Sequence, residues 1–215
     1  TMSVDPAFVS EFKSGDTRRS ASIIDWEAEG ITSLAAFGDT YRDQREYTGY
    51  TIKKYSPLCY ADGTSASKED GSGDFQLSNH QDYVIMRYAD VLLMAAELGS
   101  PKAQEYFDEV RKRAYTSEGT LSANYSQLPV TKENIMQERR LEFAFESINY
   151  WDLLRQGVDY AASKLALSEK QVYSGGIVDF ITISADRIRT TKGLSQIPYN
   201  QITLSNGTLV QNAGW

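Results

Sequence analysis

The sequence predicts a mainly α-helical fold with long irregular loops and a few short strands. Three observations support this fold class. Apolar residues recur at helical spacing in YVIMRYADVLLMAAELG, which begins at Tyr83. Ser100-Pro101 follows directly and offers an N-cap and a first-turn proline for a second helix. A third helical pattern follows Pro129. Because the turn between the first two helices is very short, we expect them to pack as a helical hairpin.

Each predicted helix has a buried face that follows from its spacing. The first helix should be largely buried and should end at Gly99. Its shared face consists of Val84, Ile85, Tyr88, Val91, Leu92 and Ala95. The second helix should run to about Tyr115, and its inward residues are Ala103, Phe107, Val110 and Ala114. The third should begin at the N-cap Thr131 and run to about Ser147, and a shorter helix should cover 150–156 before Gly157.

The chain is expected to form one domain over residues 1–215. Residues 1–80 are loop-rich, with a weak strand signal at Tyr50-Thr51-Ile52 and a polar surface loop at 61–80. Residues 81–157 form the predicted helical core. Residues 158–215 are mixed, with a polar helical piece near 159–169, the β-like run IVDFITIS and a turn-rich tail.

Charge and composition exclude several classes of function. The 29 acidic and 22 basic residues give a net charge of −7, which disfavours nucleic acid as a partner. No apolar run is long enough for a membrane-spanning helix. Cys59 and His80 are each the only residue of their type, which excludes an internal disulfide, a zinc site and a Ser/His/Asp triad. A calcium-loop spacing that starts at Asp70 fails at Phe75, where glycine is needed. We therefore expect no metal, no cofactor and no catalytic residue.

The stretch QERRLEFAFESINYWDLLRQG, residues 137–157, is dense in charged and aromatic residues. On a helix, Glu138, Glu142 and Glu146 would lie in one row, and three like charges in a row require cations from neighbouring elements. The candidate cations are Arg87, Arg111, Arg113 and Arg155, while Arg139 and Arg140 lie on other sides of the helix. We expect a structural ion network formed by Glu138, Arg139, Arg140, Glu142, Glu146 and Arg87. A catalytic carboxylate pair and a ligand contact are the alternatives.

Five blocks of the sequence carry a family resemblance. They are RYADVLLMAAEL, VRKRA, TKENIMQERRLEFAFESINYWDLLRQG, LSQIPYNQI and VQNAGW, and their order and spacing resemble the C-terminal portion of the SusD/RagB family. SGDTRRSAS and YTGYTIKKY resemble upstream blocks of the same family. The family usually has Gly and a basic residue where this chain has Ser147 and Asn149, and often Pro where it has Ala213.

The resemblance implies tetratricopeptide-like helix pairs and a non-catalytic glycan-binding function. Members of this family are outer-membrane lipoproteins of the cell surface that assist nutrient uptake through a SusC-like TonB-dependent transporter. The lipid-anchor cysteine of the family has no counterpart in this chain. Together with an opening that lacks signal-peptide character, this suggests an excised fragment that is itself soluble. The alternative is a helical-repeat scaffold that binds another protein and has no glycan site in this fragment.

Loop aromatics are the candidates for glycan contact, because sugar rings stack on aromatic faces while their hydroxyl groups pair with polar side chains. The tentative ligand-binding residues are Trp26, Tyr41 and Tyr60. Trp151 lies in the helical block and is expected in the core, and Trp215 could be a mere chain end.

Overall fold

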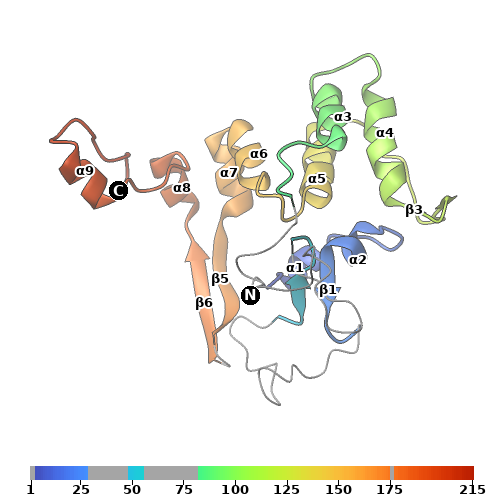
Figure 1. Ribbon diagram of the computed structural model, residues 1–215, viewed down its shortest axis with the longest axis horizontal. Coiled ribbons are helices and arrows are strands. Elements are labelled where there is room, and N and C mark those ends of the chain that lie inside the picture. Colours follow the sequence, from blue (N-terminus) through green and yellow to red (C-terminus); the bar gives the residue numbers. More distant parts are fainter. Residues whose placement is uncertain (1–2, 29–47, 56–81, 175–176) are drawn as a thin grey trace. The chain divides into compact units, whose positions relative to one another are not determined.

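The computed structural model describes residues 3–28, 48–55, 82–174 and 177–215 (Figure 1). Tyr41, Cys59, Tyr60, His80 and the calcium-loop spacing at 70–81 lie outside these ranges. The chain divides into two compact units, Thr1–Glu146 and Ser147–Trp215. The single domain over 1–215 stays a prediction.

The described residues of the first unit form helices and two small antiparallel strand pairs. Its elements are α1 (Pro6–Val9), α2 (Arg18–Ser22), β1 (Ile23–Asp25), β2 (Tyr50–Ile52), α3 (Tyr88–Glu97), α4 (Ala103–Ala114), β3 (Thr116–Ser117), β4 (Thr120–Leu121) and α5 (Lys132–Glu142). Strand β1 pairs with β2 so that Ile23 lies opposite Ile52, and β3 pairs with β4. Helix α3 packs against both α4 and α5 (Figure 1). The mainly α-helical class and the α3–α4 hairpin are confirmed.

The helix starts of this unit follow its capping residues. Thr131 caps α5 by accepting a hydrogen bond of 3.2 Å from the Asn134 N–H, as predicted. Helix α4 begins slightly later than expected, because Ser100 and Pro101 form the turn that precedes it. The Ser100 hydroxyl accepts a hydrogen bond from the Lys102 N–H in that turn. Phe107, Val110 and Ala114 are buried on α4, also as predicted.

The prediction for α3 was wrong in its start and in its face. The helix begins at Tyr88 instead of Tyr83, because the backbone of Arg87 is extended (φ −122°, ψ 157°). Its buried residues are Ala89, Leu92, Leu93 and Ala96, which share one face at helical spacing. Tyr88 and Val91, which were expected inside, are exposed. The face is set by contact with α4 and α5, which the local pattern of the sequence does not contain.

Helix α5 is shorter than predicted. It ends at Glu142, and Phe145 and Ser147 then take left-handed backbone conformations with φ values of 67° and 63°. An α-helix does not continue through such residues. Leu141 and Ala144 still enter the hydrophobic core that α5 shares with α1 and β1. The buried members of this core are Val4, Val9, Phe12, Ile23, Leu141 and Ala144.

In the part of the second unit that the structure describes, there are small helices and one antiparallel strand pair. Its elements are α6 (Asn149–Arg155), α7 (Val158–Leu165), β5 (Leu167–Ser174), β6 (Ile177–Ile183), α8 (Ala185–Thr191) and α9 (Tyr199–Leu204). Helix α7 packs against α6 and α8, and β5 pairs antiparallel with β6. The predicted end of α6 at Gly157, which has a φ of 109°, and the predicted strand at IVDFITIS are confirmed. The helical piece near 159–169 ends at Leu165, and α9 lies in a tail that was predicted to be turns.

Side chains that bond to backbone hold the end of this unit in place. Gln211 accepts from the Ile197 N–H at 2.8 Å and donates to the Ile197 carbonyl at 2.9 Å. Asn212 donates to the Ser195 carbonyl at 2.6 Å, and the Trp215 indole donates to the Leu194 carbonyl at 2.9 Å. Trp215 is therefore a structural contact. Trp151, expected in the core, is 65% exposed and packs edge-on against the ring of Tyr150.

Candidate functional site

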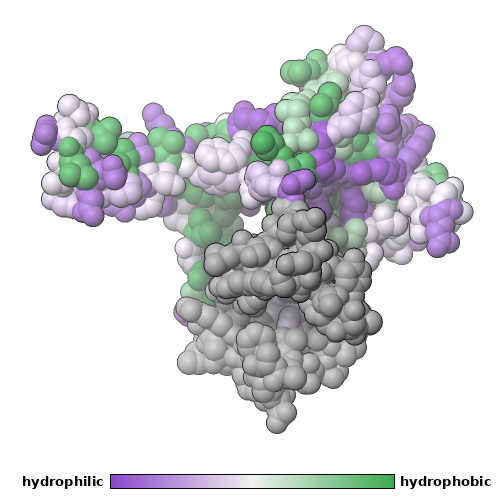
Figure 2. All heavy atoms as spheres, in the orientation of Figure 1, coloured by the Kyte–Doolittle hydropathy of each residue, from purple (hydrophilic) through white to green (hydrophobic). Residues whose placement is uncertain are grey.

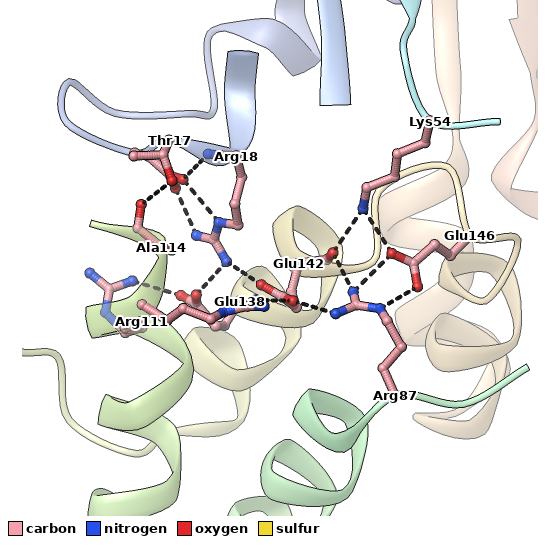
Figure 3. A network of polar contacts seen from close by, with 11 residues as sticks. Thr17, Arg18, Lys54, Arg87, Arg111, Ala114, Glu138, Glu142 and Glu146 are labelled. Carbon is pink, nitrogen blue, oxygen red and sulfur yellow. Dashed lines mark hydrogen bonds and ion pairs between the residues drawn. The ribbon is translucent and has the colours of Figure 1, made fainter. Parts of the chain in front are cut away.

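A row of three glutamates from α5 and the turn after it lies at the centre of the first unit (Figure 3). Glu138 is only 1% exposed, and Glu142 and Glu146 are also buried. A carboxylate is costly to bury unless cations and hydrogen bonds compensate for the lost hydration. The partners of these three side chains therefore decide what the site can do.

Glu138 is held between two arginines that are far from it in the sequence. Its Oε1 accepts from Arg18 of α2 at 2.6 Å, and its Oε2 accepts from Arg111 of α4 at 2.7 Å. Arg18 also forms a bidentate pair with Asp16, with distances of 2.9 and 2.7 Å. Thr17, between them, bonds through its hydroxyl and its N–H to the Ala114 carbonyl at the end of α4. Glu138 thus fastens α2 and α4 to α5.

Glu142 and Glu146 share a second group of cations. Arg87 donates to Glu142 Oε1 at 2.8 Å and binds both carboxylate oxygens of Glu146, at 2.9 and 2.8 Å. Lys54 donates to Glu146 Oε1 at 2.8 Å and to the Glu142 carbonyl at 3.2 Å. Arg113 of α4 pairs with Glu142 as well. Among the described residues, five cations (Arg18, Lys54, Arg87, Arg111 and Arg113) therefore contact four carboxylates.

Two arginines of the predicted network have other partners. Arg139 is buried and donates to Asp90 of α3 at 2.6 Å. Arg140 forms a bidentate pair with Glu11, with distances of 2.8 and 2.9 Å, and its guanidinium lies over the ring of Phe8. Arg155, which was considered as a partner of the glutamates, pairs with Asp152 at 2.9 Å. The glutamate row and Arg87 are thus brought together, while Arg139 and Arg140 make separate ion pairs from the same helix.

The sequence analysis missed Arg18 and Lys54. Both lie in blocks that carry the family resemblance, SGDTRRSAS and YTGYTIKKY. The available signal was an unmatched charge: three glutamates in one row need several cations, and these two blocks are rich in basic residues. Local spacing could not choose among them, because Arg18 and Glu138 are 120 positions apart in the sequence.

The electrostatics of the network favour the charged form of Glu142. Burial raises the pKa of Glu142, but hydrogen bonds from Arg87 and Arg113 outweigh burial and hold this pKa below its ordinary value of 4.5. Burial likewise opposes the charge of Arg18, yet its hydrogen bonds to Asp16 raise the pKa of the guanidinium further. A general acid needs the opposite, a raised carboxyl pKa. Within the described ranges, no group of three or more His, Cys, Asp or Glu side chains could hold a metal ion.

A surface depression adjoins the network. Its volume is about 590 Å³. Six residues of the network contribute to its lining: Arg18, Lys54, Arg87, Arg113, Glu142 and Glu146. The other lining residues are Thr17, Ala21, Ser22, Tyr55, Asp82, Val84 and Ala114. The depression combines one aromatic ring with charged and small side chains.

Of the three tentative glycan contacts, the structure describes only Trp26. It is half-buried at the end of β1, where its backbone N–H donates to the Gly49 carbonyl at 3.1 Å. Its neighbour Asp25 pairs with Arg19 at 2.8 Å. Trp26 does not line the depression beside the ion network. Its role in ligand binding stays a prediction.

The chain matches the SusD family over residues 5–215, and it therefore belongs to that family. SusD-like protein P38 of Formosa agariphila is 26% identical over 159 residues, which cover 61% of this chain and 31% of the relative. SusD-like protein P2 of the same organism is 37% identical over 83 residues, which cover 34% of this chain and 16% of the relative. The chain thus matches less than a third of the length of these curated relatives.

Solved structures share the fold. Surface glycan-binding protein A from Bacteroides thetaiotaomicron, in complex with laminarihexaose, superposes with a TM-score of 0.68 at 29% identity. The match covers 98% of this chain and 41% of that protein. Surface glycan-binding protein A from Bacteroides fluxus gives a TM-score of 0.66 at 28% identity, covering 99% and 40% of the two chains. A laminarin-binding SusD-like protein gives a TM-score of 0.63 at 25% identity, covering 99% of this chain and 38% of that one. The resemblance to the SusD/RagB family and its fold is confirmed.

No helix in the described part of the chain is both long enough and apolar enough to cross a membrane.

Proposed function

We propose that this protein binds a polysaccharide or oligosaccharide at the cell surface without cleaving it. The observation that carries the proposal is the match to a surface glycan-binding protein in complex with laminarihexaose, which covers 98% of this chain. A second matched structure is a laminarin-binding SusD-like protein. A glucan such as laminarin is therefore the first ligand to test.

The state of the carboxylates supports binding without catalysis. Hydrolysis of a glycosidic bond by the usual route needs two carboxyl groups that face the substrate, one of them protonated. In the first unit, Glu138 and Glu142 are buried and bonded to arginines, and Glu142 has a lowered pKa. Side chains held in this way stabilise the fold, and the lowered pKa makes Glu142 a poor proton donor.

The cellular setting is part of the same proposal. Membership of the SusD family supports a place at the surface of the outer membrane, next to a SusC-like TonB-dependent transporter that imports the bound glycan. Contact with the membrane would then come through a lipid anchor.

A protein-binding scaffold is the second candidate, and one observation favours it. Exposed apolar side chains lie on α3 and just before it, and Figure 2 shows hydrophobic surface over this helix. They are Ile85, Met86, Tyr88, Val91 and Leu98. Apolar surface of this kind fits a protein contact. Two of the matched structures are a glycan-binding protein in complex with laminarihexaose and a laminarin-binding protein, so glycan binding is our first proposal.

The test is affinity electrophoresis of the folded protein through gels that contain laminarin or other polysaccharides. Circular dichroism checks folding, and a non-binding protein of similar size corrects for gel viscosity. We expect laminarin to retard the protein and no reducing sugar to be released. A folded protein that no polysaccharide retards would contradict glycan binding and favour the scaffold, and release of reducing ends would contradict binding without catalysis.

A further inference from the structure

Two tyrosines from separate segments meet beside the depression in the first unit. We propose that Tyr55 and Tyr83 form the platform on which a pyranose ring of the glycan stacks. This inference rests on the proposed function and places the glycan site at these two residues. The sequence pattern gave neither residue a ligand-binding role.

The geometry of the pair suits a sugar ring. The two ring centroids lie 6.1 Å apart and the ring planes differ by 29°, so the rings are stacked. Tyr55 lines the depression, and Tyr83 is 63% exposed. Aromatic faces combine a flat apolar surface with a polar hydroxyl group, which matches the C–H face and the hydroxyl groups of a pyranose.

The backbone of Tyr55 is strained in a way that is common at binding sites. Its φ is 60°, in the left-handed region that bulky side chains rarely adopt. Such a conformation costs free energy and persists only where neighbouring contacts enforce it, often at ligand sites. Here the Lys53 N–H donates to the Ser22 carbonyl at 2.8 Å, and the Lys54 ammonium binds Glu146. These two contacts hold the chain immediately before Tyr55 in place.

Glu146 connects the two segments that carry the tyrosines. Lys54, next to Tyr55, donates to Glu146 Oε1 at 2.8 Å. Arg87, four residues after Tyr83, donates to both oxygens of the same carboxylate. The ion network thus holds the two segments together and makes Glu146 a positioning residue for the ring pair.

Polar groups around the depression can pair with sugar hydroxyl groups. Asp82 precedes Tyr83, is exposed and lines the depression. Arg113 also lines it and keeps 59% of its side chain exposed while it pairs with Glu142. A few oriented polar groups beside an aromatic surface are typical of sites for neutral, hydroxyl-rich ligands. The ligand class that this arrangement fits is a neutral glucan.

The test compares single variants in the laminarin and polysaccharide gels described above. Tyr83→Ala removes an exposed ring and should weaken the apparent affinity roughly tenfold, the scale of a central aromatic contact. Tyr83→Phe keeps the ring face and should bind within about twofold of the unmodified protein, because stacking needs the ring more than the hydroxyl group. Tyr199→Ala, which truncates an exposed tyrosine of α9, is the matched control and should bind normally.

The outcomes separate this inference from the proposed function. If the unmodified protein is retarded and Tyr83→Ala is retarded equally, the platform is wrong and glycan binding stands. If Trp26→Ala loses binding while Tyr83→Ala keeps it, the site lies at Trp26 and the platform is again wrong. If no polysaccharide retards the unmodified, folded protein, both proposals fall.

Discussion

The two units of this chain are stabilised by different means. In the first unit, charged side chains from α2, α4, the turn after β2 and the residue before α3 converge on three buried glutamates. In the second, few residues are buried, and the long tail is fixed by amide and indole groups that bond to backbone. In the first unit, buried ion pairs join separate elements. The second unit has ion pairs such as Arg189–Asp159, but both of these side chains are largely exposed, and its tail is held mainly by hydrogen bonds to the main chain.

This difference determines how each unit responds to substitution. A buried carboxylate that serves several cations leaves all of them unpaired when it is removed, and the cost exceeds that of any single hydrogen bond. A side-chain amide that bonds to backbone leaves neutral groups behind, which water can partly satisfy. The first unit should therefore be more sensitive to single changes and to pH than the second.

The largest effect is expected at Glu138. Glu138→Ala leaves Arg18 and Arg111 without their shared carboxylate, and we expect a loss of roughly 3–5 kcal/mol in the free energy of unfolding. Urea denaturation followed by circular dichroism measures this loss. Glu133→Ala, at an exposed position in the first turn of the same helix, is the control and should change little. Equal stability of the two variants would contradict the role given to the network.

Acid should weaken the first unit. The pKa of Glu142 is lower in the fold than its ordinary value of 4.5, so the stability that it contributes is present above pH 4.5. That stability is lost as the pH falls through the lower value of the folded state. We expect the urea midpoint to fall progressively below about pH 4.5. The Glu142→Gln variant, compared at the same pH values, should be less stable at neutral pH and show a shallower pH dependence.

A smaller effect is expected at Gln211 in the second unit. Gln211→Ala removes two hydrogen bonds to the backbone of Ile197, and we expect a loss of about 1–2 kcal/mol. Hydrogen exchange of the Ile197 amide should become faster in this variant. Gln201→Ala, at an exposed position in α9, should leave that exchange rate unchanged. Slow exchange at Ile197 in both variants would show that Gln211 is not what protects this segment.

The smallest effect is a gain in stability at Ser147. This serine has a φ of 63°, at a position where the family usually has glycine. Ser147→Gly relieves the left-handed strain but also raises the entropy of the unfolded chain. We expect the relief to be larger, so the variant should be more stable by about 0.5–1 kcal/mol. Ser147→Ala keeps the strain and should give no such gain. A melting temperature that falls in Ser147→Gly would contradict the left-handed conformation.

Local patterns predicted the parts of the fold that depend on local interactions. The N-cap Thr131, the end of α6 at Gly157 and the α3–α4 hairpin follow from capping residues and short turns. The start of α3 did not follow from its local pattern, because the side chain of Arg87 binds Glu142 and Glu146, and the backbone of Arg87 is extended. Strand β5 was missed because LSEKQVYS has little apolar alternation, and its conformation depends on pairing with β6.

The candidate site could be predicted only in outline. The spacing of Glu138, Glu142 and Glu146 indicated a need for cations, and Arg87, one of the candidate cations, pairs with Glu142 and Glu146. Arg18 is 120 positions from Glu138 in the sequence, and Lys54 is 92 positions from Glu146. No local rule connects either cation to its partner. Tyr55 and Tyr83 are likewise joined only by the fold. Long-range contacts of this kind are set by packing, which a single sequence does not display.

The central claim is that the buried glutamates stabilise the fold and do not themselves bind the glycan. It is tested most directly with Glu138→Gln, which keeps the size of the side chain and removes its charge. One preparation is used for thermal unfolding and for retardation in polysaccharide gels run below its melting temperature. The account predicts a lower melting temperature and unchanged retardation. An unchanged melting temperature with retardation lost would instead make Glu138 a ligand-binding residue and contradict the account.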